Sequence, residues 1–362
     1  MDNRLEEARK IINRVDAQMA QLFVERMRAA ELVYAYKKEY GLPILDEKRE
    51  AAVIEKNSAA IGDEVLRGYY IDYLKDVMAV SRAYQYRMQS GLKVAYSGVE
   101  GAFAHIAAGR IFPKSNRISY RDFAAAYDAV VQGESDFAVL PIENSYAGEV
   151  GQNIDLIFAG GLYINGIYEL KIKQNLLGLP GSTIADIRKV TSHPQALSQC
   201  RDYIALYGME TEEASNTAIA AKTVAESGDK TLGAIASVET AELYGLQVLD
   251  TNIHKSAENT TRFAVLSRVR ASTPAHTSSV LMFSVKNEAG TLANAINIVS
   301  KYGYNMTALR SRPLKDHSWQ YYFYIELDGT TDTDDGQKMM EELGKVCDKL
   351  KLAGTFAPHK EI

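Results

Sequence analysis

The spacing of hydrophobic and polar residues changes twice along the chain, and the first spacing pattern extends over about 90 residues. Apolar side chains there recur at alternating spacings of three and four, which places them on one face of a long helix that packs against another helix. The helix is expected from about Arg4 to Glu39 and would be roughly 50 Å long. The positions that form its apolar seam are Leu5, Ala8, Ile12, Val15, Met19 and Leu22. Because a small helical block covers so long a seam poorly, the pattern predicts a dimer that exchanges helices.

Between residues 92 and 270, short β-rich runs alternate with alanine-rich stretches of helical character. This βαβ rhythm predicts a largely parallel sheet covered by helices. The clearest strands are Lys93–Tyr96, Phe137–Pro141, Lys189–Ser192 and Gly233–Ala236.

The remaining residues change style again after a short segment, 271–277, that is typical of a linker. Strands are expected at Ser278–Val285 and Gln320–Leu327, and helices at Thr291–Tyr302 and Asp334–Leu350. The order strand, helix, strand, strand, helix, strand is that of a βαββαβ ferredoxin-like sandwich. The sequence therefore predicts a multidomain chain with an all-α domain, an α/β domain, a linker and an α+β domain, at residues 1–90, 92–270, 271–277 and 278–362.

Composition and charge narrow the class of protein. The net charge of −5 and the lack of a basic patch argue against nucleic acid as a partner. The charged N-terminal segment does not resemble a signal peptide, and no apolar run is long enough to span a bilayer. The two cysteines, Cys200 and Cys347, fit neither a disulfide framework nor a metal-ligand spacing, which favours a reducing cytoplasm. The six histidines form no HExxH-like cluster, so neither a metal nor another cofactor is expected.

The helical block carries cations at positions that the pattern assigns to the packed face. Arg26 lies at the centre of the apolar stripe, and Lys37 lies near it. Arg49 falls in the first turn of a second helix that Asp46 caps, where a cation is electrostatically unfavourable. A single charged residue in a helix seam can also serve to set the register of helix packing, or its side chain can extend to solvent at the edge of the seam. Several cations with few matching acidic residues instead indicate a pocket for an anion.

These residues resemble the all-helical chorismate mutase family. The resemblance is carried by RKIINRVD, by LFVERM, by Lys37, by the run from Pro43 to Glu50 and by SRAYQ. It implies that Arg9, Arg26 and Arg49 bind the carboxylates of chorismate, with Arg9 supplied by the partner subunit. It also implies roles for the remaining site residues. Lys37 and Gln85 would donate hydrogen bonds to the ether oxygen, and Asp46 and Glu50 would bind the ring hydroxyl. Ser81 would lie beside them. The rearrangement needs a compact conformer and cations near the breaking C–O bond, but no nucleophile.

The α/β block carries uncharged polar clusters directly after its strands, where α/β proteins place ligands. Each cluster alone is also explained by helix capping or by turn chemistry. Together, the segments PIEN, SHPQALSQ and TRF resemble the prephenate dehydratase family. The resemblance implies two α/β lobes with a cleft between them, like a periplasmic solute-binding protein, with chain crossings near Gln174 and Asp250.

The same resemblance implies that Thr261 is the central catalytic residue, accompanied in the cleft by Asn144, Ser192 and Gln199. Glu143 and Arg262 are further candidates. Prephenate loses carbon dioxide and its ring hydroxyl, so the leaving hydroxide needs a donor. We expect the Thr261 hydroxyl to supply it, with Glu143 as a relay. The chain departs from the family at Val99, Ala102 and Ala104, so the turn that contains them must bind substrate through backbone N–H groups.

The last block resembles the ACT domain attached to prephenate dehydratases, which pairs with its twin and binds phenylalanine. The resemblance rests on KNEAGTL and RSRP, and the implied phenylalanine-binding residues are Asn287, Ala289, Gly290, Thr291, Leu292, Arg310, Ser311, Arg312 and Pro313. Arg310 stands where the family usually has glutamate, and Thr291 where alanine is common. The alternative is a module that serves dimerisation alone.

The three resemblances predict one bifunctional enzyme that converts chorismate to prephenate and then to phenylpyruvate. They imply feedback inhibition by L-phenylalanine, a homodimer or homotetramer, and no nucleic-acid or membrane partner. Two alternatives stay open: dehydration of arogenate, and a non-catalytic two-lobed amino-acid-binding protein. The sequence argues against a third, a mutase fused to prephenate dehydrogenase. The last would need a nicotinamide fingerprint, which the sequence lacks.

Overall fold

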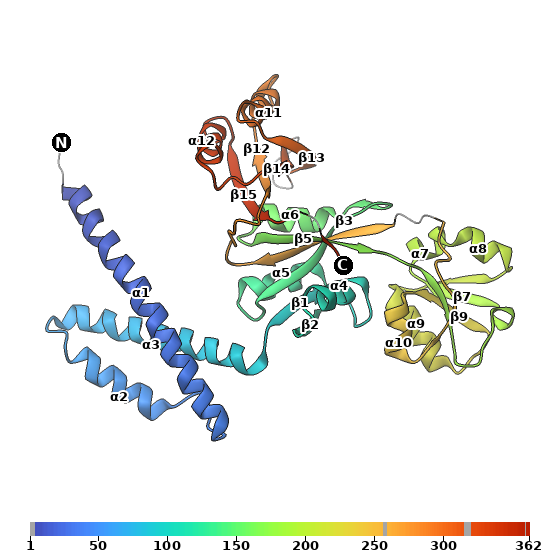
Figure 1. The fold of residues 1–362 in the computed structure, drawn as a ribbon, viewed down its shortest axis with the longest axis horizontal. Coiled ribbons are helices and arrows are strands. Elements are labelled where there is room, and N and C mark those ends of the chain that lie inside the picture. The colour runs from blue at the N-terminus through green and yellow to red at the C-terminus, as the bar shows by residue number, and fades with distance from the viewer. Residues whose placement is uncertain (1–3, 256–258, 315–319, 359) are drawn as a thin grey trace. The chain divides into compact units, whose positions relative to one another are not determined.

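The structure, a computed structural model, describes residues 4–255, 259–314, 320–358 and 360–362 (Figure 1). The chain divides into two compact units, Met1–Leu92 and Lys93–Ile362. In the part of the chain that the structure describes, no helix combines the length and the apolar character that crossing a membrane requires.

The first unit consists of the helices α1 (Arg4–Glu39), α2 (Glu47–Ser58) and α3 (Glu64–Ser90). The predicted long helix is confirmed, and the turn that contains Pro43 separates it from α2. Asp46 caps α2 by accepting the Arg49 N–H at 3.0 Å. α3 packs against both other helices. Leu5 and Leu22 on the predicted seam of α1 are nevertheless 61% and 62% exposed, so one copy of the unit leaves this seam uncovered.

The second unit begins with an α/β lobe, here called lobe 1. Its elements are β1 (Lys93–Ser97), α4 (Phe103–Ile111), β2 (Asn116–Tyr120), α5 (Phe123–Val131), β3 (Phe137–Asn144), β4 (Gly148–Glu149), α6 (Gly151–Ala159), β5 (Tyr163–Lys171) and β11 (Thr260–Ser267). β1 runs parallel to β2 and β3, as predicted. β11 instead lies antiparallel between β3 and β5, because it returns from the other lobe. The expectation of a largely parallel sheet is therefore wrong for this half of lobe 1. It is also wrong for part of the second α/β lobe, where β6 (Asn175–Gly178) pairs antiparallel with β9 (Leu232–Ala236) and with β10 (Gln247–Asp250).

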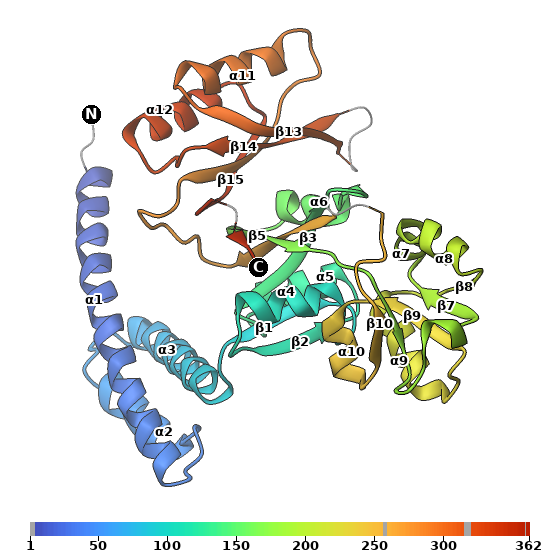
Figure 2. The ribbon, with the colours of Figure 1, turned by 45° about the vertical axis from the view of Figure 1, so that its right-hand side comes forward.

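The other α/β lobe, lobe 2, contains a sheet in the order β10-β6-β9-β7-β8. Its elements are β6 (Asn175–Gly178), the short helix η1 (Ile184–Asp186), β7 (Lys189–Ser192), α7 (Pro194–Gln199), α8 (Arg201–Leu206), β8 (Glu210–Glu213), α9 (Thr217–Ser227), β9 (Leu232–Ala236), α10 (Val238–Tyr244) and β10 (Gln247–Asp250). The chain enters lobe 2 between β5 and β6 and leaves it between β10 and β11, so Gln174 and Asp250 lie at the two crossings (Figure 2).

The C-terminal module has the predicted order of six elements, followed by the short strand β16 (Lys360–Glu361). The six are β12 (Ser278–Ser284), α11 (Thr291–Lys301), β13 (Asn305–Pro313), β14 (Tyr321–Asp328), α12 (Asp334–Leu343) and β15 (Lys349–Phe356). The strands lie in the order β13-β14-β12-β15 and pair antiparallel. The helix predicted to reach Leu350 ends at Leu343, because Lys349 and Leu350 belong to β15.

One strand contact continues the sheet of the C-terminal module into lobe 1. Gly354 of β15 pairs with Ile164 of β5. A Cβ atom at Gly354 would lie 2.0 Å from the Ile164 carbonyl oxygen, so the contact requires glycine at this position. The module and lobe 1 also share a core in which the Tyr322 and Phe158 rings stack with centroids 4.1 Å apart.

Candidate functional site

A cavity of about 370 Å³ lies in the helical unit, in the size range of small-molecule sites. It contains all the predicted mutase residues except Arg9, which is exposed on α1 outside the described lining. The polar lining residues are Arg26, Lys37, Asp46, Arg49, Glu50, Ser81, Arg82 and Gln85.

Hydrogen bonds fix several of these side chains. The Arg26 guanidinium donates to the Ser81 hydroxyl and to the Val77 carbonyl at 3.4 Å. Lys37 Nζ donates to the Ile44 carbonyl at 2.5 Å, which ties the end of α1 to the loop after Pro43. Arg82 forms an ion pair with Glu50. Sequence reasoning missed Arg82, although it stands between Ser81 and Gln85 in the SRAYQ segment.

Gln85 presents an unused hydrogen-bonding group to this cavity. Its side chain is buried, and its Nε2 makes a long contact of 3.4 Å with the Ser81 carbonyl. Its Oε1 has no hydrogen-bond partner among the described residues. Buried polar atoms are seldom left unpaired, so a partner from a bound molecule is expected here. The assignment of Oε1 and Nε2 can exchange by a flip of the amide, so either a donor or an acceptor of a ligand would fit.

A second cavity of about 280 Å³ lies between the two α/β lobes. Lobe 1 contributes the end of β3, the start of α4 and the β4 hairpin, and lobe 2 contributes the starts of α7 and α9. The polar residues that line this cleft are Asn144, Glu149, Gln174, His193, Gln195, Gln199, Asn216, Thr217, Asn259 and Thr261.

A chain of side-chain hydrogen bonds crosses the cleft. Asn144 Nδ2 donates to Thr261 Oγ1 and to Asn259 Oδ1, both at 2.9 Å. Asn259 Nδ2 in turn donates to Gln199 Oε1 at 3.0 Å. Thr261 lies opposite Asn144 in the pairing of β11 with β3, so strand register brings the two together. The structure thus unites Thr261, Asn144 and Gln199 through Asn259, which sequence reasoning missed although it directly precedes the TTRF run.

Three other predicted dehydratase residues lie outside the described lining of this cleft. Ser192 is fully buried and donates to the Ile235 carbonyl at 2.6 Å, which holds β7 beside β9. Arg262 points away from the cleft and donates to Glu143 at 3.0 Å. It also forms a bidentate pair with Glu326 of the C-terminal module, at 2.9 and 2.8 Å. Burial acts to raise the pKa of Glu326, but the hydrogen bonds and charge of Arg262 outweigh it and lower that pKa.

None of the described residues that line the cleft is a lysine or an arginine. Two helices, α4 and α9, instead begin at the wall of the cleft. The free N–H groups at the N-terminus of a helix favour the binding of an anion. Ala102, one of the positions at which the chain departs from the family, offers α4 no side-chain cap. Gln174, at the first chain crossing, is buried with its Oε1 unpaired among the described residues.

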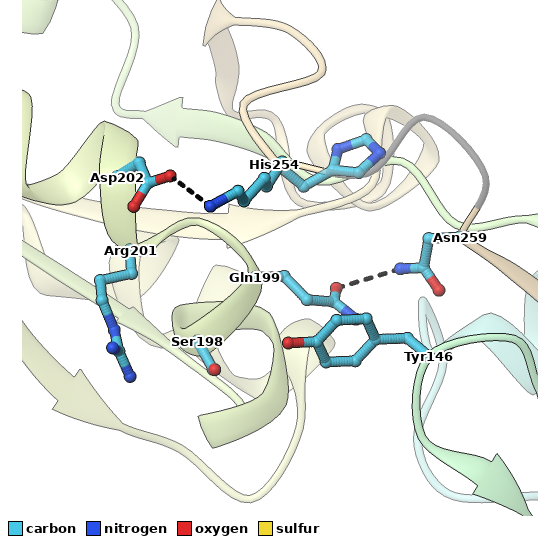
Figure 3. A pocket seen from close by; sticks show the side chains of 8 residues that line it. Tyr146, Ser198, Gln199, Arg201, Asp202, His254 and Asn259 are labelled. Carbon is cyan, nitrogen blue, oxygen red and sulfur yellow. Dashed lines mark hydrogen bonds and ion pairs between the residues drawn. The ribbon is translucent and has the colours of Figure 1, made fainter.

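A smaller pocket of about 110 Å³ adjoins this cleft and shares Gln199 and Asn259 with it (Figure 3). Figure 3 shows the Gln199–Asn259 hydrogen bond beside the Tyr146 ring. An ion pair of 3.2 Å between Lys255 and Asp202 lies on another wall. Burial lowers the pKa of the His254 imidazole below its usual value. Arg201 and Lys255 bring positive charge close to the cleft.

In the C-terminal module, the two predicted phenylalanine-binding segments lie at the same end of the sheet. Ser284, at the end of β12, pairs with Tyr322, which in turn pairs with Arg312 of β13. The turn after β12 contains Asn287 and Ala289 and leads into α11, with Gly290 at φ +87° and Leu292 half-buried. Thr291 Oγ1 donates to the Lys286 and Glu288 carbonyls at 2.6 and 2.9 Å and so closes this turn.

The arginines of the second segment point toward lobe 1. Arg310 donates to Glu143 at 2.6 Å, and Arg312 donates to Asp155 at 2.8 Å and to Glu149 at 2.7 Å. Since side chains alternate along a strand, Ser311 faces the other side of β13. Among the described residues, no group of three or more histidine, cysteine, aspartate or glutamate side chains is arranged to hold a metal ion.

Comparison with known proteins identifies two families along the chain. Residues 8–86 match the family model "Chorismate mutase type II", and residues 94–271 match "Prephenate dehydratase". A bifunctional chorismate mutase/prephenate dehydratase of Aquifex aeolicus is 30% identical over 361 residues, which cover 97% of each chain.

Two further relatives match about three quarters of the chain. An Arabidopsis thaliana protein described as arogenate dehydratase/prephenate dehydratase 1 is 34% identical over 285 residues, which cover 74% of this chain and 72% of that protein. The crystal structure of a prephenate dehydratase from Arthrobacter aurescens in complex with L-Phe superposes with a TM-score of 0.68 at 25% identity, and covers 74% of this chain and 90% of that one.

Proposed function

The chain belongs to the bifunctional chorismate mutase/prephenate dehydratase family, and we propose that the helical cavity houses its first reaction and the interlobe cleft its second. Chorismate would rearrange to prephenate beside Arg26 and Lys37. Prephenate would then lose carbon dioxide and hydroxide beside Thr261 to give phenylpyruvate. The observation that carries the second assignment is the hydrogen bond from Asn144 to Thr261 inside the cleft.

The mutase cavity suits a compact dianion. Arg26 and Arg49 would bind the two carboxylates, since guanidinium groups form charge-assisted bonds with them. Lys37 and the Gln85 amide would donate to the ether oxygen, which gains negative charge as its bond to carbon breaks. Asp46 and Glu50 would accept the ring hydroxyl, and Arg82 holds Glu50 in place. Ser81 would act indirectly, by orienting Arg26.

The mutase site is proposed to be completed by a second copy of the chain. Arg9 is exposed on α1, and the seam residues on the same helix are uncovered in one copy. Pairing of two copies along α1 would bury this seam and bring Arg9 of one copy to the cavity of the other. A homodimer, or a tetramer built from such dimers, is therefore proposed.

Hydrogen-bond direction supports Thr261 as the donor in dehydration. Asn144 Oδ1 accepts the N–H groups of Tyr146 and Ala147 at 3.0 and 2.8 Å, so its Nδ2 must face Thr261. The Thr261 oxygen accepts from Nδ2, so its O–H can donate a hydrogen bond to the hydroxide as it leaves, and the threonine keeps its proton. Gln199 and Asn259 would orient the ring. The carboxylates would be held by the N-termini of α4 and α9 rather than by cations.

The experiment that tests both assignments supplies chorismate to the purified protein and follows prephenate and phenylpyruvate with time. Prephenate should accumulate transiently and then give phenylpyruvate. Absence of both products would leave only the non-catalytic binding protein. Parallel assays with prephenate and arogenate resolve the dehydratase substrate. Prephenate is the proposed one, because the bifunctional relative aligns over nearly the whole chain whereas the plant relative aligns over 74% of it.

The C-terminal module is proposed to be an ACT domain that binds L-phenylalanine and inhibits dehydration. Its βαββαβ order and the meeting of its two motifs at one end of the sheet support this proposal, as does the L-Phe bound to the related structure.

The domains would then be 1–90, 92–270 and 278–362, with a linker at 271–277; residues 1–3, 256–258, 315–319 and 359 lie outside the described residues. The free cysteines Cys200 and Cys347 accord with a cytoplasmic location.

A further inference from the structure

We propose that Arg310 is a positioning residue for the dehydration reaction, although it belongs to the C-terminal module. It bridges two glutamates that lie opposite each other in a hairpin of lobe 1, and this hairpin carries Asn144. The inference rests on the proposed placement of dehydration at Asn144 and Thr261.

The hairpin formed by β3 and β4 contains a repulsive pair. Glu143 and Glu149 are directly paired across it, and Asn144 pairs with Gly148 at the next position. Like charges at opposed positions destabilise a strand pair. Glu149 also lines the cleft, and the turn between the two strands is closed by Asn144 Oδ1, which accepts the N–H groups of Tyr146 and Ala147. Repulsion between these glutamates would therefore disturb the turn that orients Asn144 toward Thr261.

Arginines of β13 supply the compensating charge. Arg310 Nη2 donates to Glu143 at 2.6 Å, and its Nε lies 3.9 Å from a Glu149 oxygen, so one guanidinium reaches both carboxylates. Arg312, two positions further on the same face of β13, donates to Glu149 at 2.7 Å. The Arg310 and Glu143 side chains are only 20% and 28% exposed, and such partly buried pairs are screened less by salt than surface pairs.

The same contacts change the role expected for Glu143. Arg310 and Arg262 both hold its side chain, which lies outside the described lining of the cleft and so does not reach the Thr261 hydroxyl. Glu143 therefore serves as an anchor of β3 to the C-terminal module instead of a proton relay. Its neighbour Asn144, which does face the cleft, conveys this anchoring to the Thr261 hydroxyl.

The test compares Arg310→Gln with Arg310→Lys in the full-length protein, with prephenate as substrate. Glutamine removes the charge, so kcat for phenylpyruvate formation should fall at least tenfold, whereas lysine retains a cation near Glu143 and should recover most of the loss. Adding Glu149→Gln to Arg310→Gln removes the repulsion by another route and should raise kcat above that of Arg310→Gln alone. The mutase rate of each variant serves as the internal standard for enzyme concentration, since that site lies in the other unit.

Arg270→Gln is the matched control. Arg270 also pairs with an acidic residue of the C-terminal module, Asp332, at 2.7 and 2.8 Å, but neither residue belongs to the hairpin formed by β3 and β4. It should leave kcat within twofold of the wild type. The inference is overturned if Arg310→Gln keeps the wild-type kcat and KM, or if the lysine and glutamine variants lose kcat equally. A Thr261→Ala variant assayed beside them separates the two proposals: its full activity would instead refute the placement of dehydration in this cleft.

Discussion

Asn144 Nδ2 lies 2.9 Å from Thr261 Oγ1, across a registered pair of β3 and β11. This short contact joins two motifs that are more than a hundred residues apart in the sequence. It fixes the threonine oxygen as an acceptor, so the threonine proton is left for the substrate.

Replacing Thr261 by alanine is expected to lower dehydratase kcat/KM by about 100-fold or more, because general acid catalysis typically contributes that much. Thr261→Ser keeps the hydroxyl and should retain a measurable fraction of the rate. Both variants are assayed with prephenate, and the mutase rate serves as the internal standard. Equal loss in the serine and alanine variants would show that the methyl group, and not the hydroxyl, matters.

Replacing Gln85 by glutamate should make the mutase reaction depend on pH. A carboxyl group at this buried position donates to the ether oxygen only while it is protonated, so the rate should be present at low pH and decline as pH rises through the pKa of the new acid. The wild-type amide does not titrate, so its rate should stay level over the same range. Initial rates of chorismate loss between pH 5 and pH 8 would show this difference, and a pH-independent variant would contradict contact between residue 85 and the ether oxygen.

Mixing two inactive mutase variants tests whether Arg9 acts across a subunit interface. Arg9→Ala and Arg26→Ala each disable both sites of a dimer. In an equal mixture that has exchanged subunits, about a quarter of the wild-type mutase rate should return, because half of the dimers are mixed and each holds one intact site. The mixture is unfolded and refolded together, and each variant treated alone is the control. No recovery in a mixture shown to contain mixed dimers would place Arg9 in its own subunit's site.

The sequence predicted the elements whose signals are local. The bounds of α1 and the order of the C-terminal module follow from periodicity and turns. The 3.6-residue period places Arg26 and Lys37 on or near the packed face, whereas Gln85 and the other mutase candidates rested on the family resemblance. The antiparallel placement of β11 could not be predicted this way, because it depends on where the chain returns from lobe 2.

Sequence reasoning also failed where a side chain's partner belongs to a distant element. Ser192 was expected in the cleft, but its hydroxyl bonds the Ile235 carbonyl of the adjacent strand. Glu143 and Arg262 were expected beside the substrate, but both bind residues of the C-terminal module. Nothing in the PIEN or TRF segments indicates that neighbouring residues face opposite sides, which the strand alternation of the folded sheet decides.

A comparison of two glycines tests the proposed phenylalanine site. Gly290 and Gly303 both have left-handed backbones, at φ +87° and +78°, and a Cβ atom at either would meet no neighbour within 4 Å. An alanine at each therefore introduces a similar strain of about 1–2 kcal/mol, but only Gly290 lies in the turn proposed to bind the amino acid. Dehydratase rates measured against L-phenylalanine concentration should show inhibition of the wild type and of Gly303→Ala, and inhibition shifted to at least tenfold higher concentration in Gly290→Ala. Equal shifts in the two variants would mean that general strain in the module, and not the turn at Gly290, controls inhibition, and an uninhibited wild type would leave the module with the role of dimerisation alone.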